Sequence, residues 1–208
     1  MFEENTYIIL GITGVGKSTL IKVLSDDKSI QIGETYKSCT KECKSYNFDY
    51  NNIKYCFIDT PGFVDTEGDS KDKINYEFIK QILTDKKYKI KGIIIIFNFQ
   101  ENKFLTYHEK SLKKIIDLVP LNNFWSYITI VFSHTYGNGF GNLEEKKKEK
   151  LKNIKQCLKT IMDDYYYKKG IEIINLDNLN CHFINIMYGE VKKEEKALSD
   201  LIKSLEKF

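Results

Sequence analysis

The 208-residue chain is predicted to fold as an α/β domain: a mostly parallel, six-stranded sheet with one antiparallel hairpin edge and helices on both faces. Three observations predict this class. Short, nearly all-apolar runs alternate with longer segments whose apolar residues recur at helical spacing. Two of the strand candidates flank an Asn-Asn pair, which favours a hairpin. The hydrophobic fraction of 42% is enough for one sizeable core, so residues 1–208 are expected to form a single domain.

The strand candidates are short runs at intervals along the chain. The first, "TYIIL", ends directly before Gly11, and "SYNFDY" and "IKYCFI" flank Asn51 and Asn52 as the two arms of the hairpin. Three further runs follow: "GIIIIFNF", "YITIVFS" and "HFINIM". Runs this apolar suit strands that are buried on both faces of a parallel sheet.

The helix candidates are amphipathic. "KSTLIKVLS" follows the first strand, "YHEKSLKKIIDLV" precedes the fifth, and a longer helix is expected from Asn142 to Met162 with "EEKKKEK" on its solvated face. A final helix, about residues 190–208, is expected to close the fold by packing on the sheet. An interfacial or self-association helix is the alternative there. In "KDKINYEFIKQILTD" the predicted apolar stripe consists of Ile74, Phe78, Ile79, Ile82 and Leu83.

Composition limits the partners. The formal net charge is +3, which is too small to favour nucleic acid, and every basic residue is lysine. The five cysteines are odd in number and no signal peptide precedes them, so a reduced, cytoplasmic chain is expected. The longest apolar run, residues 92–99, is too short to span a bilayer. A peripheral position at a membrane would therefore need an anchor that this sequence does not display.

One motif carries a definite chemistry. "GITGVGKST" matches G-x-x-x-x-G-K-[ST] between a predicted strand and a predicted helix, the context that a phosphate-binding loop requires. Its glycines let backbone N–H groups approach phosphates, and the helix start adds the positive end of a dipole. The lysine charge suits the β- and γ-phosphates, and the serine hydroxyl suits Mg²⁺. The residues expected to bind the nucleotide here are Gly14, Val15, Gly16, Lys17, Ser18 and Thr19.

Two further elements extend this site. In "CFIDTPGFVDT", Asp59 ends a strand and can hold Mg²⁺ through a water, while Gly62 can offer its N–H to a γ-phosphate. Strand ends of a parallel sheet converge on one crevice, which strengthens this otherwise common pattern. Thr40 in "SCTKEC" can ligate Mg²⁺ and sense the γ-phosphate, as switch segments of GTPases do. The predicted metal ligands are therefore Ser18, Thr40 and, through a water, Asp59.

In this order, these blocks resemble the AIG-type GTPases, the immunity-associated (GIMAP) group related to septins and chloroplast import-receptor GTPases. The resemblance rests on "GITGVGKST", "CTKEC", "IDTPGFVDT", "GIIIIFNF" with "NKFLTYHE", and "CHFIN", and it spans residues 5–205. It implies a three-layer P-loop GTPase G domain, GTP and GDP as ligands, Mg²⁺ as cofactor, and nucleotide-dependent homodimers or oligomers. It also implies action at a cytosolic membrane surface or on an effector protein.

The base-reading segment departs from the family's pattern. The family usually has an aspartate at the place of Tyr136, and this chain instead reads "SHTY". His134 can lie along one face of the base, and Asn185 matches the family's second base-contacting motif and can meet the guanine edge with its amide. Losing an ionised acceptor costs about 1.5–3 kcal/mol, so discrimination against adenine should be weaker unless another acceptor compensates.

Slow hydrolysis is expected. Phe63 stands where many GTPases carry a water-orienting glutamine, and the chain has no arginine to act as a finger, even across a homodimer. Lys103 sits about where relatives often carry an arginine, and it brings charge without the planar fork; an ordinary exposed lysine is the alternative. Turnover near the unassisted range of roughly 10⁻⁴–10⁻² s⁻¹ is predicted. The predicted catalytic contributors are Lys17, Thr40, Gly62 and Lys103.

Three functions stay open at this point. The first is a slow GTPase switch that dimerises when GTP is bound. The second is a nucleotide-stabilised scaffold with negligible hydrolysis, which assembles as septins do or recruits partners. The third is an ATP-using P-loop kinase or ATPase, which the missing aspartate keeps open although no acceptor-binding domain is evident.

Overall fold

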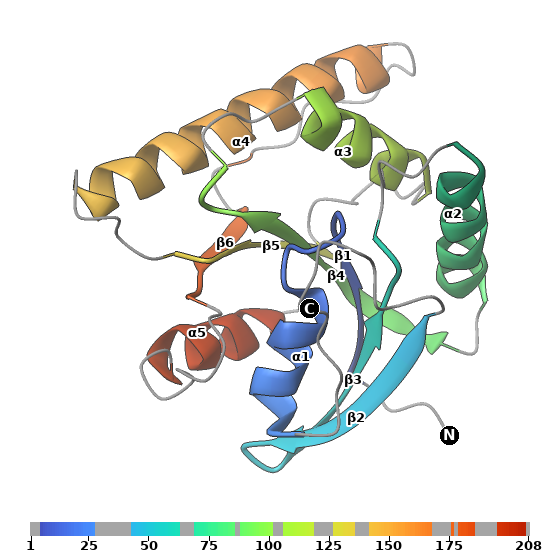
Figure 1. The fold of residues 1–208 in the computed structure, drawn as a ribbon, viewed down its shortest axis with the longest axis vertical. Helices are drawn as coiled ribbons and strands as arrows, with labels where there is room; N and C mark the ends of the chain where they lie inside the picture. Colours follow the sequence, from blue (N-terminus) through green and yellow to red (C-terminus); the bar gives the residue numbers. More distant parts are fainter. Residues whose placement is uncertain are drawn as a thin grey trace.

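A computed structural model shows a sheet flanked by helices (Figure 1). In chain order the elements are β1 (Thr6–Leu10), α1 (Lys17–Ser25), β2 (Lys44–Tyr50), β3 (Ile53–Asp59), α2 (Asp69–Thr84), β4 (Ile90–Asn98), α3 (Thr106–Leu118), β5 (Ile128–Ser133), α4 (Leu143–Tyr167), β6 (Asn180–Phe183) and α5 (Glu195–Leu205). The structure describes residues 5–27, 43–62, 69–85, 88–101, 106–118, 127–135, 142–167, 176, 179–185 and 195–206.

The strands form a six-stranded sheet in the order β2-β3-β1-β4-β5-β6. Neighbouring strands are parallel except β2 and β3, which pair antiparallel up to Tyr50 and Ile53. Asn51 and Asn52 make the turn with φ of 51° and 64°, a left-handed conformation that asparagine tolerates and that suits the twist of a hairpin. The predicted fold class, with its antiparallel edge, is confirmed.

Helices cover both faces of the sheet (Figure 1). The side chains of β1 point alternately to the two faces. Ile8 and Leu10 pack in the core cluster under α2, α3 and α4, whereas Tyr7 and Ile9 pack in the cluster under α1 and α5. Because both faces are buried, the central strands read as continuous apolar runs. The layers leave the carboxyl ends of the parallel strands along one edge, where a ligand of an open α/β sheet binds.

The apolar stripe predicted on α2 is only partly buried. Ile79 is fully covered and Ile82 is 7% exposed, but Ile74 and Phe78 are 56% and 40% exposed. Successive residues of a helix are rotated by about 100°, so Phe78 and Ile79 cannot both face the sheet squarely. The stripe taken from the sequence was therefore wider than the face that packs.

The last helix, α5, lies against the same sheet face as α1 (Figure 1). Leu198, Leu201, Ile202 and Leu205 are buried there. The hydroxyl of Tyr7 donates a hydrogen bond of 2.9 Å to the carbonyl of Leu205, which ties the end of the helix to the central strand β1. The ends of the predicted helix, residues 190–194 and 207–208, lie outside the described residues.

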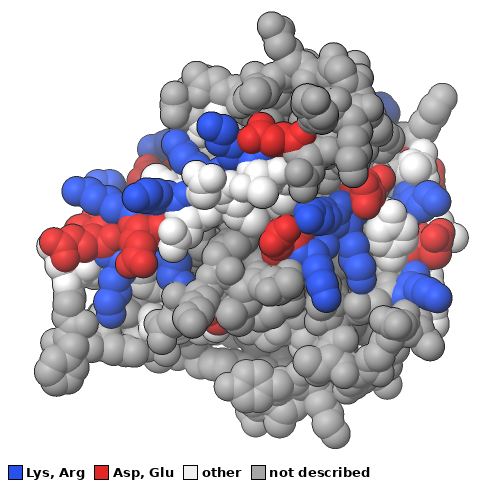
Figure 2. Space-filling model, turned by 90° about the horizontal axis from the view of Figure 1, so that it is seen from above, with Lys and Arg blue, Asp and Glu red and all other residues white. Residues whose placement is uncertain are grey.

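On the sheet face opposite α5, helices α3 and α4 carry both positive and negative side chains on their exposed sides. Figure 2 looks from above and shows lysine and acidic side chains intermingled over the described surface. Two of the ion pairs are Lys147 with Glu144 at 2.9 Å on α4 and Lys113 with Glu109 at 2.8 Å on α3. Exposed pairs of this kind contribute little to stability. Within the described ranges, no helix has both the length and the apolarity needed to cross a bilayer.

Candidate nucleotide-binding site

The loop between β1 and α1 has a backbone that its glycines make possible. Gly14 and Gly16 have φ of 81° and 95°, in the left-handed region that other residues rarely adopt. A Cβ on Gly11 would lie 2.7 Å from the carbonyl oxygen of Ile96 and 2.9 Å from Cγ2 of Val15, so the loop packs against β4 only with glycine there. Gly16 is the N-cap of α1 and makes no side-chain cap hydrogen bond. A bound anion can therefore take the place of a cap.

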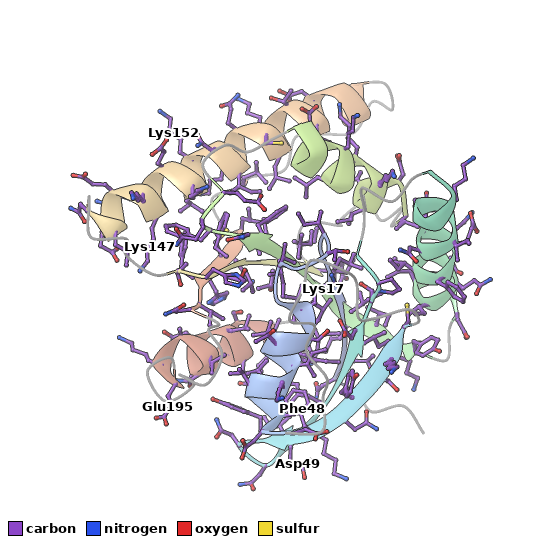
Figure 3. The ribbon with its side chains drawn as sticks, viewed as in Figure 1. Lys17, Phe48, Asp49, Lys147, Lys152 and Glu195 are labelled. Carbon is purple, nitrogen blue, oxygen red and sulfur yellow. The ribbon has the colours of Figure 1, made fainter. Side chains whose placement is uncertain are left out.

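Lys17 is held at this loop by the loop's own carbonyl groups. It is 7% exposed, and its Nζ donates hydrogen bonds to the carbonyls of Gly11 at 3.0 Å and Ile12 at 2.9 Å. Figure 3 shows Lys17 at the start of α1, in the middle of the molecule. A buried ammonium group is costly unless it is hydrogen-bonded, so these contacts keep the charge in place. An entering phosphate can then join or replace the carbonyl partners.

The second motif meets the first through a short hydrogen bond. Parallel pairing of β1 with β3 sets Asp59 opposite Ile9, and Ser18 Oγ donates to Asp59 Oδ2 at 2.6 Å. Thr60, the next residue, donates from Oγ1 to the carbonyl of Ile9 at 2.6 Å. The end of β3 is thus fixed against both β1 and the first turn of α1.

This pair of oxygens fits Mg²⁺. The ion prefers hard oxygen ligands, retains several waters, and in nucleotide sites takes only one or two protein groups besides the phosphates. Ser18 offers a hydroxyl and Asp59 a carboxylate, already within one hydrogen bond of each other. Thr40, the third predicted ligand, lies outside the described residues.

Gly62 lies tightly against the phosphate loop. A Cβ on Gly62 would lie 2.5 Å from the backbone nitrogen of Thr13 and 2.8 Å from its Cα. From the other side, Asn75 Nδ2 on α2 donates to the Gly62 carbonyl at 3.0 Å. The strand-end segment is therefore held between α2 and the loop, with its backbone beside the place expected for a terminal phosphate.

The two base-reading candidates leave adjacent strands at the same sheet edge. β5 and β6 are paired up to Phe132 and Phe183, and the Ile184 amide donates to the Phe132 carbonyl at 2.9 Å. His134 and Asn185 each follow two positions after that pair. The Oδ1 atom of Asn185 is buried and finds no hydrogen-bond partner among the described residues. Such an atom is costly to leave unsatisfied and so suits a ligand donor.

His134 is held in a defined state. Its φ is 55°, and its Nδ1 lies 2.9 Å from Ser133 Oγ. When Ser133 Oγ donates its one hydrogen to the Phe97 carbonyl at 3.2 Å, Nδ1 carries the imidazole hydrogen and donates to Oγ. Burial lowers the pKa of His134, with Glu101 acting in the opposite direction. The ring is therefore neutral near pH 7, and Nε2 is an acceptor.

The predicted site residues divide into two groups. The structure brings Lys17, Ser18, Asp59 and Gly62 together and places His134 beside Asn185, although their ligand contacts stay predictions. Thr40 and Lys103 lie outside the described residues, as do Phe63 and Tyr136. Residues that sequence reasoning missed are Thr13, Asn75 and Gln100. Thr13 occupies a variable place of the loop motif, and Asn75 and Gln100 belong to no motif at all.

A glycine-rich loop that joins the first strand to the first helix of a mostly parallel sheet, with an aspartate at the next strand end, defines a P-loop nucleotide site. A family model described as 50S ribosome-binding GTPase matches residues 6–132. That match covers more than half of the 208 residues. The chain belongs to this P-loop GTPase family.

Relatives with curated descriptions match over different lengths. GTP-binding protein A of Dictyostelium discoideum is 33% identical over 138 residues, covering 65% of this chain and 29% of that protein. Immune-associated nucleotide-binding protein 13 of Arabidopsis thaliana is 24% identical over 209 residues, covering 98% of this chain and 55% of that protein. The chain therefore spans about a third to a half of the length of these two relatives.

Solved structures share the fold. Toc33 from Arabidopsis thaliana superposes with a TM-score of 0.75 at 13% identity, over 97% of this chain and 82% of that one. Era from Aquifex aeolicus, bound to GDP and AlF₄⁻, gives a TM-score of 0.61 at 19% identity, over 98% of this chain and 56% of that one. At these identities the likeness shows the fold alone.

Proposed function

We propose that this chain binds GTP and GDP with Mg²⁺ and hydrolyses GTP slowly, as a molecular switch. One observation carries the proposal: buried Lys17, the Ser18–Asp59 hydrogen bond of 2.6 Å and Gly62 meet around one phosphate loop. Toc33, which shares the fold, is known with Mg²⁺ and GMPPNP and with GDP and Mg²⁺. We expect this chain to bind the same ligands.

Different groups of the chain contact the phosphates and the metal ion. Lys17 neutralises the β- and γ-phosphates, and the first-turn amides of α1 bind their oxygens. Ser18, and Asp59 through a water, would hold Mg²⁺, and the bound ion would supply positive charge against the charge that develops during phosphoryl transfer. The backbone N–H of Gly62 meets the γ-phosphate, so the segment at Gly62 distinguishes GTP from GDP.

Two neutral acceptors take the place of the missing aspartate. Guanine presents N1–H and the 2-amino group as donors, and adenine offers no donor pair at the same edge positions. The Oδ1 atom of Asn185 and Nε2 of the neutral His134 can accept hydrogen bonds from such donors. Uncharged acceptors contribute less than a carboxylate, so guanine preference is retained but is weaker than with aspartate.

The chain lacks the usual means of fast hydrolysis. It contains no arginine, and Phe63 replaces the residue that would orient a water. Turnover in the unassisted range, roughly 10⁻⁴–10⁻² s⁻¹, follows unless Lys103 supplies charge or a partner protein supplies an arginine.

We further propose an AIG-type assignment and nucleotide-dependent dimerisation. The immune-associated relative aligns with 98% of this chain. Dimerisation is described as important for the GTPase activity of chloroplast Toc33 and Toc159, and an arginine-to-alanine variant of Toc33 is dimerisation-deficient. Because this chain has no arginine, its dimer would have to use lysine or backbone groups instead. A cytoplasmic location, peripheral at a membrane or with an effector protein, belongs to the same proposal.

Phosphate release measured at increasing protein concentration tests this function. We expect slow, Mg²⁺-dependent release from GTP whose rate per molecule rises with concentration. Lys17→Ala should abolish it, whereas Lys196→Ala, which removes an equal charge from the exposed face of α5, should not. A GTP-dependent shift in molecular mass without any phosphate release would favour the scaffold, and equal use of ATP would favour an ATP-using enzyme.

A further inference from the structure

The turn that follows β4 bonds to the base-reading segment. Gln100 lies two residues beyond β4, and its side-chain Nε2 donates a hydrogen bond of 2.7 Å to the backbone carbonyl of His134. The backbone amide of Gln100 donates in turn to Asn98 Oδ1 at 2.9 Å. The side chain therefore reaches across from β4 while its own backbone is fixed at the strand end.

The acceptor of that bond is a residue under conformational constraint. His134 has φ of 55°, a left-handed conformation that costs a non-glycine residue free energy and that persists only where surrounding contacts determine it. Its carbonyl direction depends on that conformation. A hydrogen bond of 2.7 Å to the carbonyl selects this turn over the extended backbone that would continue β5.

The same turn is anchored on its other sides as well. The Phe99 amide donates to the Ser133 carbonyl at 2.9 Å. Lys150 of α4 donates to the carbonyl of Glu101, and its Nζ lies 5.9 Å from the ring centroid of Phe99. Residues 98–101 thus connect β4, α4 and the His134 turn, and Gln100 supplies the link that reaches His134.

We propose that Gln100 is a positioning residue for base recognition: by binding the His134 carbonyl, it holds the imidazole where its Nε2 can accept from guanine. This inference rests on the proposed guanine-nucleotide function. Gln100 would then be a specificity determinant that contacts neither the phosphates nor Mg²⁺. Removing the Gln100 side chain should therefore change which base is preferred and leave binding of the phosphate groups intact.

The test compares Gln100→Leu, which keeps the side-chain size and removes the donor, with Gln81→Leu on the exposed face of α2. Isothermal titration calorimetry with Mg²⁺-GDP, Mg²⁺-ADP and Mg²⁺-pyrophosphate gives three affinities for each variant. We expect Gln100→Leu to weaken GDP binding about tenfold, the scale of one lost hydrogen bond to a held group. ADP and pyrophosphate affinities should change less than twofold, and Gln81→Leu should match wild type throughout.

A second variant and a spectroscopic readout separate positioning from packing. Gln100→Glu keeps the shape, cannot donate when ionised, and places a negative charge near His134. It should lose guanine preference as Gln100→Leu does and should raise the pKa of His134, followed by NMR of the imidazole nitrogens. If Gln100→Leu fails to fold, Gln100→Glu carries the same affinity test.

The outcomes are distinguishable. Selective loss of GDP affinity together with a changed His134 titration supports the proposal. A wild-type ratio of GDP to ADP affinity in both variants, or an equal loss for all three ligands, would overturn it. Failure of the wild-type protein to bind GDP at all would instead overturn the proposed function.

Discussion

Replacing Gly62 with alanine should separate GTP binding from GDP binding. The added Cβ would lie 2.5 Å from the Thr13 nitrogen and 2.8 Å from its Cα, whereas ordinary contact begins at 3.4 Å. The two segments must therefore separate by about 0.6–0.9 Å, the difference between those distances. The nearest atom, Thr13 Oγ1, belongs to a side chain that can rotate away, but the nitrogen and Cα of Thr13 are backbone atoms and cannot. Gly62 is not among the residues with positive φ, so the effect comes from the contact and not from backbone strain.

The size of the effect follows from that displacement. A shift of about 1 Å in a group that contacts the reacting phosphate costs on the order of 10²-fold in rate, or about 2.7 kcal/mol. Only the γ-phosphate is expected to contact the Gly62 amide, so the affinity for GMPPNP should fall. The affinity for GDP should stay within about twofold of wild type, a free-energy difference of about 0.4 kcal/mol.

Calorimetric titration with the Mg²⁺ complexes of GMPPNP and GDP measures both affinities, and phosphate release measures the rate. Gly92→Ala is the matched control, because its Cβ would meet the Tyr7 ring at 3.1 Å, within β4 and away from the loop. That variant should leave the ratio of the two affinities unchanged. Equal weakening of GMPPNP and GDP by Gly62→Ala would refute the argument that the Gly62 segment reads the γ-phosphate.

Three further predictions follow from single contacts. Tyr7→Phe removes the hydroxyl donor to the buried Leu205 carbonyl and should lower the free energy of unfolding by about 1–3 kcal/mol in a urea titration, with the nucleotide affinity unchanged. Ser18→Ala should reduce the gain in GDP affinity that Mg²⁺ provides by at least about tenfold, the scale typical of a lost metal-site partner, as seen by comparing titrations with Mg²⁺ and with EDTA. Burial lowers the pKa of His134, so below about pH 6.5 the unfolded chain binds a proton that the folded chain binds less readily, and stability falls. In His134→Gln, the melting temperature should therefore change less between about pH 7.5 and 5.5 than it does in the wild-type protein.

The fold could be predicted because its signals are local. The central strands are buried on both faces and read as apolar runs, and Asn51 and Asn52 mark the one antiparallel turn. Prediction was poorer at the far edge of the sheet, where "HFINIM" was expected and β6 spans Asn180–Phe183. All four residues of that strand are only half-buried, so the hydrophobic pattern there is weak, and its register is set by pairing with β5.

The placement of the candidate site residues could be predicted where the chemistry and the spacing coincide in one short motif. The positions of Lys17 and Ser18 follow from the transition from loop to helix. The position of Asp59 follows from the end of β3, the strand that pairs with β1. Asn75 and Gln100 could not be found in the same way. Their partners, the carbonyls of Gly62 and His134, lie 13 and 34 residues away in the chain. Every residue has a backbone carbonyl, so the sequence does not indicate which carbonyl accepts such a bond.

Equilibrium dialysis with labelled GDP and Mg²⁺, and with unlabelled ATP or GTP as competitor, tests directly whether this site binds guanine nucleotides. We expect that the native protein retains GDP, that Lys17→Ala does not, and that ATP displaces GDP less effectively than GTP does. Retention by Lys17→Ala equal to that of the native protein, or no retention by a protein shown to be folded, would contradict it.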